Sequence, residues 1–91
     1  EKITKNAYKL EQNIPNPFTQ STLISYALPE DSTKASILVF DLNGRMLRSY
    51  ELNEKNGKLK INATELNDSG MYLYTLFANG EEIITKKMIL K

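Results

Sequence analysis

The chain has few of the side chains on which enzymes and metal sites depend. Its 91 residues include no histidine and no cysteine, so the commonest general base, the commonest metal ligand and thiol chemistry are all missing. The serines and threonines occur in no GxSxG motif and have neither a histidine nor a plausible lysine partner, so none fits a nucleophile. We therefore expect no catalytic residue.

The carboxylates are equally unsuited to catalysis or metal binding. Glu81 and Glu82 are adjacent on an expected strand, so their side chains point to opposite faces instead of acting as a pair. Asp31, Asp41 and Asp68 lie beside turns without the oxygen spacing of a calcium loop, and we expect them to accept local hydrogen bonds. The four glycines also lie at turns, outside any phosphate-binding motif. We predict no metal and no cofactor.

The charged side chains are balanced. With 12 basic and 11 acidic groups the formal charge is +1, which gives no reason to expect a polyanion or an anionic membrane as partner. Lys86, Lys87 and Lys91 lie near two tyrosines, but lysines that keep an edge strand from aggregating explain them more simply than nucleic-acid binding. No apolar run approaches the ~20 residues of a membrane-spanning helix. We expect no nucleic acid, no membrane insertion and a monomer.

The last two predicted strands are the clearest. Residues 71–78 are apolar and rich in Tyr, Leu and Phe, Asn79 and Gly80 follow at once, and residues 81–90 resume an extended pattern. This order predicts a β-hairpin with a type I′ turn, because that turn needs positive φ at both central residues. Glycine accepts positive φ freely, and asparagine tolerates it better than most residues.

The turn also predicts the register of this hairpin. Counting outward gives four facing pairs: Ala78 and Glu81, Leu76 and Ile83, Tyr74 and Thr85, Tyr72 and Lys87. The core face would then carry Tyr72, Tyr74, Leu76 and Ile83, and the other face Met71, Leu73, Thr75, Phe77, Ile84 and Met88. Because that other face is also rather apolar, we expect something in this molecule or in a partner to cover part of it. Lys86 and Lys87 interrupt the alternation, which predicts a bulge or a strand that passes the sheet edge.

Five earlier segments alternate in the same way: residues 8–13, 22–28, 35–42, 46–52 and 58–62. Residues 35–42 are apolar on both sides of the alternation, which predicts the middle strand of a sheet with both faces covered. Asn43 and Gly44 repeat the hairpin signal. Seven strands without a helical period predict one two-layered domain over residues 8–91. Residues 1–7 are polar and aperiodic, so we expect a linker from the upstream part of a larger protein.

Two local motifs refine this prediction. Pro15 and Pro17 remove two amide donors, which predicts a rigid corner that ends the first strand and presses Phe18 into the core. A docking loop for another protein is the alternative, and we favour the corner. Leu66 and Tyr72 have the spacing of a tyrosine corner, in which a phenol hydroxyl bonds to upstream backbone. We therefore predict an all-β, seven-stranded immunoglobulin-like (fibronectin III-like) β-sandwich.

Four blocks of sequence carry a resemblance to a known family. They are Asn13-Ile14-Pro15-Asn16-Pro17-Phe18, the turn Asp41-Leu42-Asn43-Gly44-Arg45, Gly70-Met71-Tyr72, and the ending Lys86-Lys87-Met88-Ile89-Leu90. In this order they resemble the conserved blocks of the C-terminal sorting domain of the type IX secretion system, and the resemblance covers almost the whole chain from Tyr8 on. It implies an immunoglobulin-like sandwich that acts as a non-enzymatic secretion address for an upstream cargo.

The resemblance also implies partners and a route. The cargo would pass the periplasm, cross the bacterial outer membrane through the type IX translocon and its shuttle proteins, and reach the cell surface or the medium. A sortase-like cysteine protease would then remove the domain, and the cargo would be released or joined to an anionic lipopolysaccharide. The runner-up is a fibronectin III-like accessory module, for adhesion or carbohydrate association, that stays attached to its enzyme. A sorting domain must end its parent protein, and the end of this chain at Lys91 favours sorting.

The terminal hairpin is the predicted address, because an exposed edge strand offers unpaired backbone groups to a receptor by strand addition. Lys86 and Lys87 would supply recognition charges and Met88, Ile89 and Leu90 apolar anchors, with Gly70, Tyr72 and Lys91 completing the set. The alternative is that these residues only complete and protect the edge, and the sequence leaves both open. A structural role is predicted for Asn13, Pro15, Asn16, Pro17, Phe18, Asp41, Gly44 and Leu66.

Overall fold

The computed structural model of the chain describes residues 7–66 and 68–91. Its elements within these ranges are β1 (Lys9–Leu10), β2 (Ser21–Ala27), β3 (Ala35–Phe40), β4 (Met46–Glu51), β5 (Asn56–Asn62), the short 3-10 helix η2 (Ala63–Glu65), β6 (Gly70–Ala78) and β7 (Glu81–Leu90). The prediction of an all-β chain with seven strands is confirmed. Most of the expected linker, residues 1–6, lies outside the described residues.

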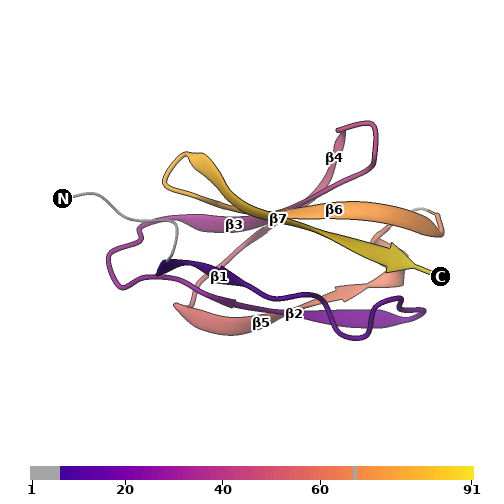
Figure 1. Cartoon of the computed structure of the whole chain (residues 1–91), viewed down its shortest axis with the longest axis horizontal. Helices are drawn as coiled ribbons and strands as arrows, with labels where there is room; N and C mark the ends of the chain where they lie inside the picture. Colours follow the sequence, from indigo (N-terminus) through magenta and orange to yellow (C-terminus); the bar gives the residue numbers. More distant parts are fainter. Residues whose placement is uncertain (1–6, 67) are drawn as a thin grey trace.

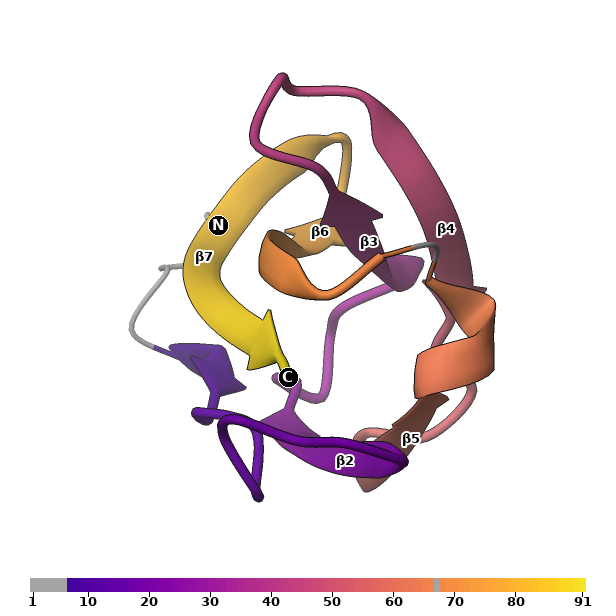
Figure 2. The same ribbon diagram turned by 90° about the vertical axis from the view of Figure 1, so that its right-hand side faces the viewer.

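The strands form two antiparallel sheets that face each other (Figure 1). Sheet A has the strand order β1-β2-β5, and sheet B has the order β4-β3-β6-β7. Seen end on, the sheets enclose one interior, with β7 beside β1 at one side and β4 and β5 at the other (Figure 2). We call these the β1/β7 side and the β4/β5 side.

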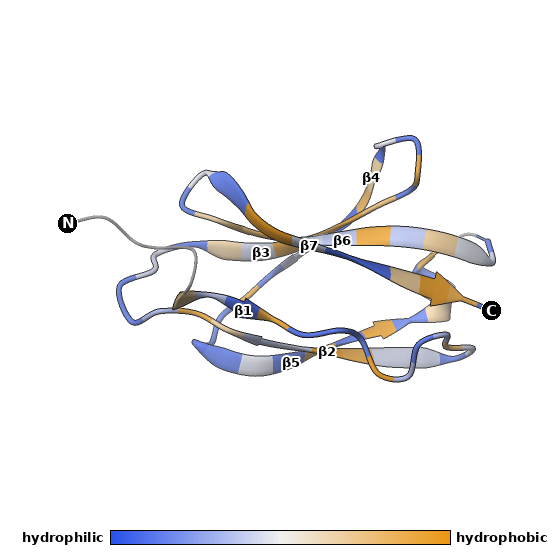
Figure 3. Cartoon of the chain, in the orientation of Figure 1, coloured by the Kyte–Doolittle hydropathy of each residue, from blue (hydrophilic) through white to orange (hydrophobic). Residues whose placement is uncertain are grey.

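The core lies between the sheets because the strands alternate. In β3, Ala35, Ile37 and Val39 are buried, and the residues between them are only half-buried. Figure 3 shows hydrophobic segments in β6 and toward the end of β7, and hydrophilic residues in the turns. The buried apolar residues of both sheets form one cluster: Tyr8, Leu10, Phe18, Ile24, Tyr26, Ala35, Ile37, Val39, Ile61, Leu66, Tyr72, Tyr74, Leu76, Ala78, Met88 and Leu90.

The position of β3 in the sheet agrees with the prediction from the sequence, but the exposure of its outer face does not. β3 pairs with β4 on one side and β6 on the other, so the prediction of a middle strand is confirmed. Ser36, Leu38 and Phe40 point away from the core and stay half-exposed, because no layer of the described chain covers that side of sheet B. The prediction that both faces of this strand are covered is therefore wrong.

The turn of the terminal hairpin has the predicted conformation. Asn79 (φ 53°) and Gly80 (φ 82°) both have positive φ, as a type I′ turn requires. Asn79 is also tied to other segments, because its Nδ2 donates to the Tyr8 hydroxyl (2.7 Å) and its Oδ1 accepts from Thr33 Oγ1 (2.9 Å). These bonds hold the turn against the start of sheet A and the loop before β3.

The predicted register of the hairpin is right only next to the turn. Ala78 faces Glu81 and Phe77 faces Glu82, but Leu76 then faces Ile84, so Ile83 is the extra residue of a bulge. The bulge is therefore at Ile83 and not at the two lysines, as the alternation had indicated. Since facing alternates with a period of two, one extra residue reverses every side chain that follows.

This reversal corrects the two predicted faces of β7. Met88 faces Tyr72 and is fully buried in the core, although the predicted register placed it on the outside. Ile84, also expected outside, packs partly against the core, and so does Ile83. The predicted core face of β6 is confirmed, because Tyr72, Tyr74 and Leu76 are buried.

The β3–β4 connection is not a second type I′ turn. Within it only Gly44 (φ 88°) has positive φ, and the loop is held by the Asp41 carboxylate. Asp41 Oδ1 accepts from the backbone N of Asn43 and of Arg45, both at 2.9 Å. These bonds, that of Arg45 first, hold the pKa of Asp41 below its usual value. The prediction that Asp41 accepts local hydrogen bonds is confirmed.

Candidate recognition surface

Two segments that are far apart in the sequence meet along the edge of sheet B. Residues 12–18, which we call the edge segment, run beside the C-terminal half of β7, and an isolated parallel bridge joins Phe18 to Leu90. Four hydrogen bonds connect them: Gln12 Nε2 to Lys87 O (2.6 Å), Ile89 N to Asn16 Oδ1 (2.9 Å), Phe18 N to Ile89 O (3.0 Å) and Lys91 N to Phe18 O (2.8 Å). The first predicted strand is shortened to Lys9–Leu10. Beyond it the chain stays bonded to β2 only through Glu11 N to Ser25 O and an isolated bridge between Ile14 and Leu23, before it reaches β7.

The edge segment corrects the role predicted for β7. Strand addition needs unpaired backbone groups along an edge. Between Lys87 and Lys91 these groups are already bonded within the molecule, on both the N–H and the C=O of Ile89. The prediction that this part of β7 offers a free edge to a receptor is therefore wrong.

The inner side of the edge segment is held by Asn13, a fully buried polar residue. Its Nδ2 donates to Thr22 Oγ1 (3.0 Å) and to Pro15 O (3.1 Å), and its backbone N donates to the Tyr74 hydroxyl (2.9 Å). The Tyr74 hydroxyl in turn donates to Glu11 O (2.8 Å). Burial raises the pKa of Tyr74, which further favours the protonated phenol that donates this bond.

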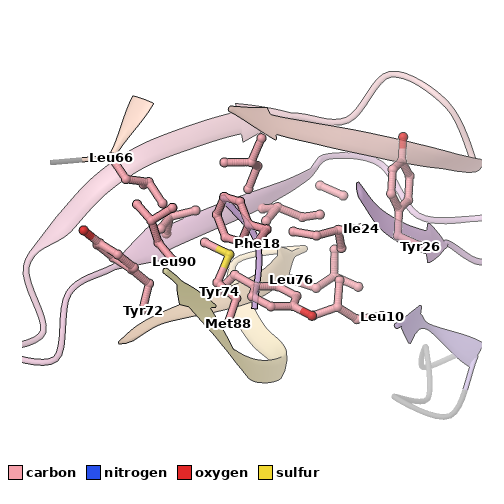
Figure 4. Close-up of a cluster of buried hydrophobic side chains, with 14 of the residues drawn as sticks. Leu10, Phe18, Ile24, Tyr26, Leu66, Tyr72, Tyr74, Leu76, Met88 and Leu90 are labelled. Atoms are coloured by element: carbon pink, nitrogen blue, oxygen red, sulfur yellow. The ribbon is translucent and has the colours of Figure 1, made fainter. Parts of the chain in front are cut away.

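Phe18 anchors the edge segment in the core. Its side chain is 1% exposed, and Figure 4 shows its ring among side chains of both sheets, including Ile24 from β2 and Met88 from β7. The corner predicted from Pro15 and Pro17 is confirmed, because it ends the first strand and delivers Phe18 to the interior.

The tyrosine corner predicted at Tyr72 has the expected hydrogen bond. The Tyr72 hydroxyl donates to Asp68 O and accepts from Asp68 N (3.1 Å). Leu66, the other member of the motif, is buried in the core. Both residues therefore stabilise the end of the sandwich where β6 begins.

The residues predicted to contact a receptor do not form one surface. Tyr72, Met88 and Leu90 are buried in the core, so they cannot contact a partner while the domain is folded. Lys86 faces Tyr74 on the core side of β7, whereas Lys87 faces Leu73 on the opposite side. Gly70, Ile89 and Lys91 are exposed. The prediction that Met88 and Leu90 are apolar anchors for a receptor is thus wrong for the folded domain.

Lys87 and Ile89 lie at one end of a larger surface, which we call the outer face of sheet B. Its apolar residues are Leu38, Phe40, Met46, Met71, Leu73, Phe77 and Ile89, and its polar residues are Ser36, Ser49, Glu51, Thr75, Glu82, Thr85 and Lys87. Met71 and Ile89 face each other across β6 and β7 and are 39% and 36% exposed. A depression of about 260 Å³ lies in this face, lined by Phe40, Gly44, Leu73, Thr75, Glu82 and Thr85.

The sequence indicated only part of this surface. The apolar outer side of β6 was visible from the hairpin register, but the contribution of β3 and β4 was not. Leu38 and Phe40 had the required apolar alternation, which favoured an incorrect covered face instead. The pairing of β3 with β6, which no local pattern specifies, makes these residues neighbours of Leu73 and Thr75.

The described residues contain no group of three or more acidic side chains placed to hold a metal ion. In the same ranges no helix has both the length and the apolar character needed to cross a membrane.

Comparison with known families gives the decisive observation. Residues 13–91 match the model of the secretion system C-terminal sorting domain, the sorting domain of type IX secretion. The chain belongs to this family. No curated protein and no solved structure matches it. The matched range begins at Asn13 and reaches the end of β7, so it includes all of β7 and all of the edge segment except Gln12.

The four sequence blocks that carry the resemblance to the family mainly stabilise the fold of this sorting domain. Asn13 and Phe18 fix the edge segment, Asp41 fixes the β3–β4 turn, and Tyr72 closes its corner on Asp68. In the last block, Met88 and Leu90 fill the core, and Ile89 pairs its backbone with the edge segment. The sorting domain thus uses its most specific residues to build one closed unit.

Proposed function

We propose that the chain is a non-enzymatic secretion signal that directs an upstream cargo protein across the bacterial outer membrane through the type IX secretion system. The observation that carries this proposal is the family match over residues 13–91. The cargo is joined through the linker at residues 1–7, passes the periplasm, and arrives at the cell surface or in the medium. A sortase-like cysteine protease then cuts upstream of the folded domain.

We infer that the fold is of the immunoglobulin-like, fibronectin III-like class. In such sandwiches strands A, B and E share one sheet and strands C, F and G share the other. Here β1, β2 and β5 form sheet A, while β3, β6 and β7 lie in sheet B with β4 beside β3. The tyrosine corner at Tyr72 lies on β6, which has the position of strand F.

We propose that the secretion machinery binds side chains on the outer face of sheet B and adds no strand to β7. Two observations support this mode: the edge segment already occupies the backbone of β7 from Lys87 to Lys91, and the adjoining face exposes Met71 and Ile89. Lys87 faces Leu73 within this surface and supplies a positive charge. Exposed apolar patches bordered by charge are characteristic of protein-binding surfaces.

An export assay tests the whole proposal. Residues 1–91 are fused behind a periplasmic reporter in a cell that has type IX machinery, and we expect the reporter at the surface or in the medium. A reporter that stays in the periplasm would contradict the sorting function. A reporter that is exported equally well without residues 1–91 would instead favour an accessory module.

Matched charge reversals test the proposed surface within that assay. Lys87→Glu changes the outer face of sheet B, and Lys60→Glu makes the same change opposite Leu23 on the outer face of sheet A. Both variants should keep the parental denaturant midpoint, because both side chains are exposed. We expect only Lys87→Glu to reduce export, and equal export of the two variants would move the recognition site elsewhere.

A further inference from the structure

The chain contains three asparagines that are each followed by glycine: Asn43, Asn56 and Asn79. Such pairs are chemically labile, because the backbone nitrogen of the glycine can attack Cγ of the asparagine side chain. The new N–Cγ bond closes a succinimide ring, the Cγ–Nδ2 bond breaks, and ammonia leaves with the proton of the glycine nitrogen. Water then opens either carbonyl of the ring and gives aspartate or isoaspartate. The reaction needs water and no other reagent.

Asn79 is protected by its side-chain contacts. The nitrogen that must leave, Nδ2, donates to the Tyr8 hydroxyl (2.7 Å), and Oδ1 accepts from Thr33 Oγ1 (2.9 Å). Rotation of Cγ toward the nitrogen of Gly80 would break both bonds. The reaction at this pair therefore carries the cost of releasing the turn from two neighbouring segments.

Asn56 is protected by its backbone. It begins β5, and Gly57 faces Tyr26 in the ladder between β2 and β5. The Tyr26 ring also covers Gly57 so closely that its hydroxyl lies 2.8 Å from where a Cβ would be. The extended chain and the covering ring leave little freedom for the glycine nitrogen to approach the side chain.

Asn43 has neither the side-chain hydrogen bonds of Asn79 nor the extended, covered backbone of Asn56. It is exposed in the β3–β4 turn, and its side-chain amide makes no hydrogen bond among the described residues. A Cβ placed on Gly44 would meet no atom within 4 Å, so space for the ring is open. The bond that must first open is the one from Gly44 N to Asp41 O (3.0 Å), at the exposed tip of the hairpin.

We propose that Asn43 is the site at which this domain deamidates spontaneously, ahead of Asn56 and Asn79. The product carries a carboxylate two residues after Asp41, in the turn whose Gly44 lines the depression on the outer face of sheet B. In isoaspartate the main chain also gains one methylene group, which changes the spacing of the turn. The modification therefore alters the border of an exposed surface and leaves the core intact.

Peptide mapping of the aged folded chain tests this proposal. The tryptic peptide 35–45 contains Asn43 as its only amide side chain, so its conversion can be followed by mass and by the chromatographic shift of isoaspartate. We expect Asn43 to convert at least about tenfold faster than Asn56 or Asn79, which corresponds to ~1.4 kcal/mol in barrier height. This difference is close to the net worth of one hydrogen bond.

Two controls make the outcome specific to the structure. In denaturant the three pairs should react at similar rates, since all share the Asn-Gly sequence. Tyr8→Phe removes the partner of Asn79 Nδ2 and should speed conversion at Asn79 while leaving Asn43 unchanged. Conversion of Asn56 or Asn79 in the folded parent as fast as that of Asn43 would overturn the proposal.

Discussion

The two sides of the sandwich are closed by different chemistry. On the β1/β7 side the edge segment uses amides, hydroxyls and backbone groups, and it buries Asn13 and Phe18 almost completely. On the β4/β5 side a residue of η2 joins the sheets through its carboxylate and its backbone oxygen. Glu65, at the end of η2, accepts from the Tyr50 hydroxyl and from Asn62 Nδ2 (3.1 Å), and its backbone O accepts from Arg48 Nε (2.7 Å).

This difference predicts how each side responds to mutation and to pH. A buried neutral network costs much to break, because each group left without a partner keeps its desolvation penalty. A half-exposed carboxylate is partly screened by water and contributes less, but it can be protonated. The β1/β7 side should therefore carry more of the stability, and the β4/β5 side should carry more of its acid sensitivity.

The largest effect is expected for Phe18→Ala. This change removes the anchor of the edge segment from the core, and deletion of a buried Phe costs about 3–5 kcal/mol of unfolding free energy. Urea unfolding followed by circular dichroism measures it. Phe77→Ala makes the same chemical change on the half-buried outer face of sheet B and should cost clearly less. Equal losses of unfolding free energy in the two variants would show that the β1/β7 side does not contribute more to stability than the rest of the domain.

Asn13→Ala should have the next largest effect. It removes two hydrogen bonds, those from Asn13 Nδ2 to Thr22 Oγ1 and to Pro15 O, and leaves these two oxygens bonded only to each other (2.8 Å). At about 0.5–1.5 kcal/mol for each bond, the expected loss is about 1–3 kcal/mol. The denaturant midpoint should fall at every pH between mild acid and neutrality by a similar amount. A loss that appears only in acid would contradict the neutral character of this network.

Acid should act on the β4/β5 side through Glu65. The hydrogen bond from Tyr50, followed by that from Asn62, holds the pKa of Glu65 below its ordinary value of 4.5. A lowered folded pKa gives stability that is present above 4.5 and is lost as the pH falls through the folded value. Glu65→Gln should therefore lower the unfolding free energy near neutrality by about 1 kcal/mol. In acid the unfolding free energies of the variant and the parent should become more similar.

Asp41 also has a lowered pKa and contributes to the same acid range, so the informative quantity is the difference between parent and variant. Asn13→Ala serves as the matched control, because it should shift the whole curve of stability against pH without changing its slope. If Glu65→Gln keeps the full parental slope, the acid response belongs to other carboxylates.

The smallest effects are expected for the outermost bond on each side. Asn16→Ala removes the acceptor of Ile89 N, and Arg48→Ala removes the donor to Glu65 O. Both side chains are exposed, so each loss should lie near ~0.5 kcal/mol, the low end for one hydrogen bond. Thermal unfolding of the two variants should give similar shifts. A much larger loss for Asn16→Ala would mean that the exposed bond from Ile89 N to Asn16, and not the buried contacts of Phe18 and Asn13, holds the edge segment in place.

Local patterns predicted most of the strands because they act over few residues. The alternation in β2 and β6, the positive φ at Asn79 and Gly80, and the corner at Pro15 and Pro17 each depend on neighbours in the sequence. The bulge at Ile83 was missed because Ile83 and Ile84 are both apolar and either fits the core face. The choice between them depends on packing against Leu76, which the alternation does not contain.

The sequence by itself determined that this chain is an all-β unit of its family without histidine or cysteine chemistry, since composition and short-range spacing specify those features. Only the tertiary structure decided which residues of the first and last of the four family blocks remain accessible to a partner. The backbone of β7 is occupied by a segment that precedes it by more than 70 residues, as the bond between Asn16 and Ile89 shows. Contacts at such separation depend on how two sheets close around a common core, so no local periodicity encodes them.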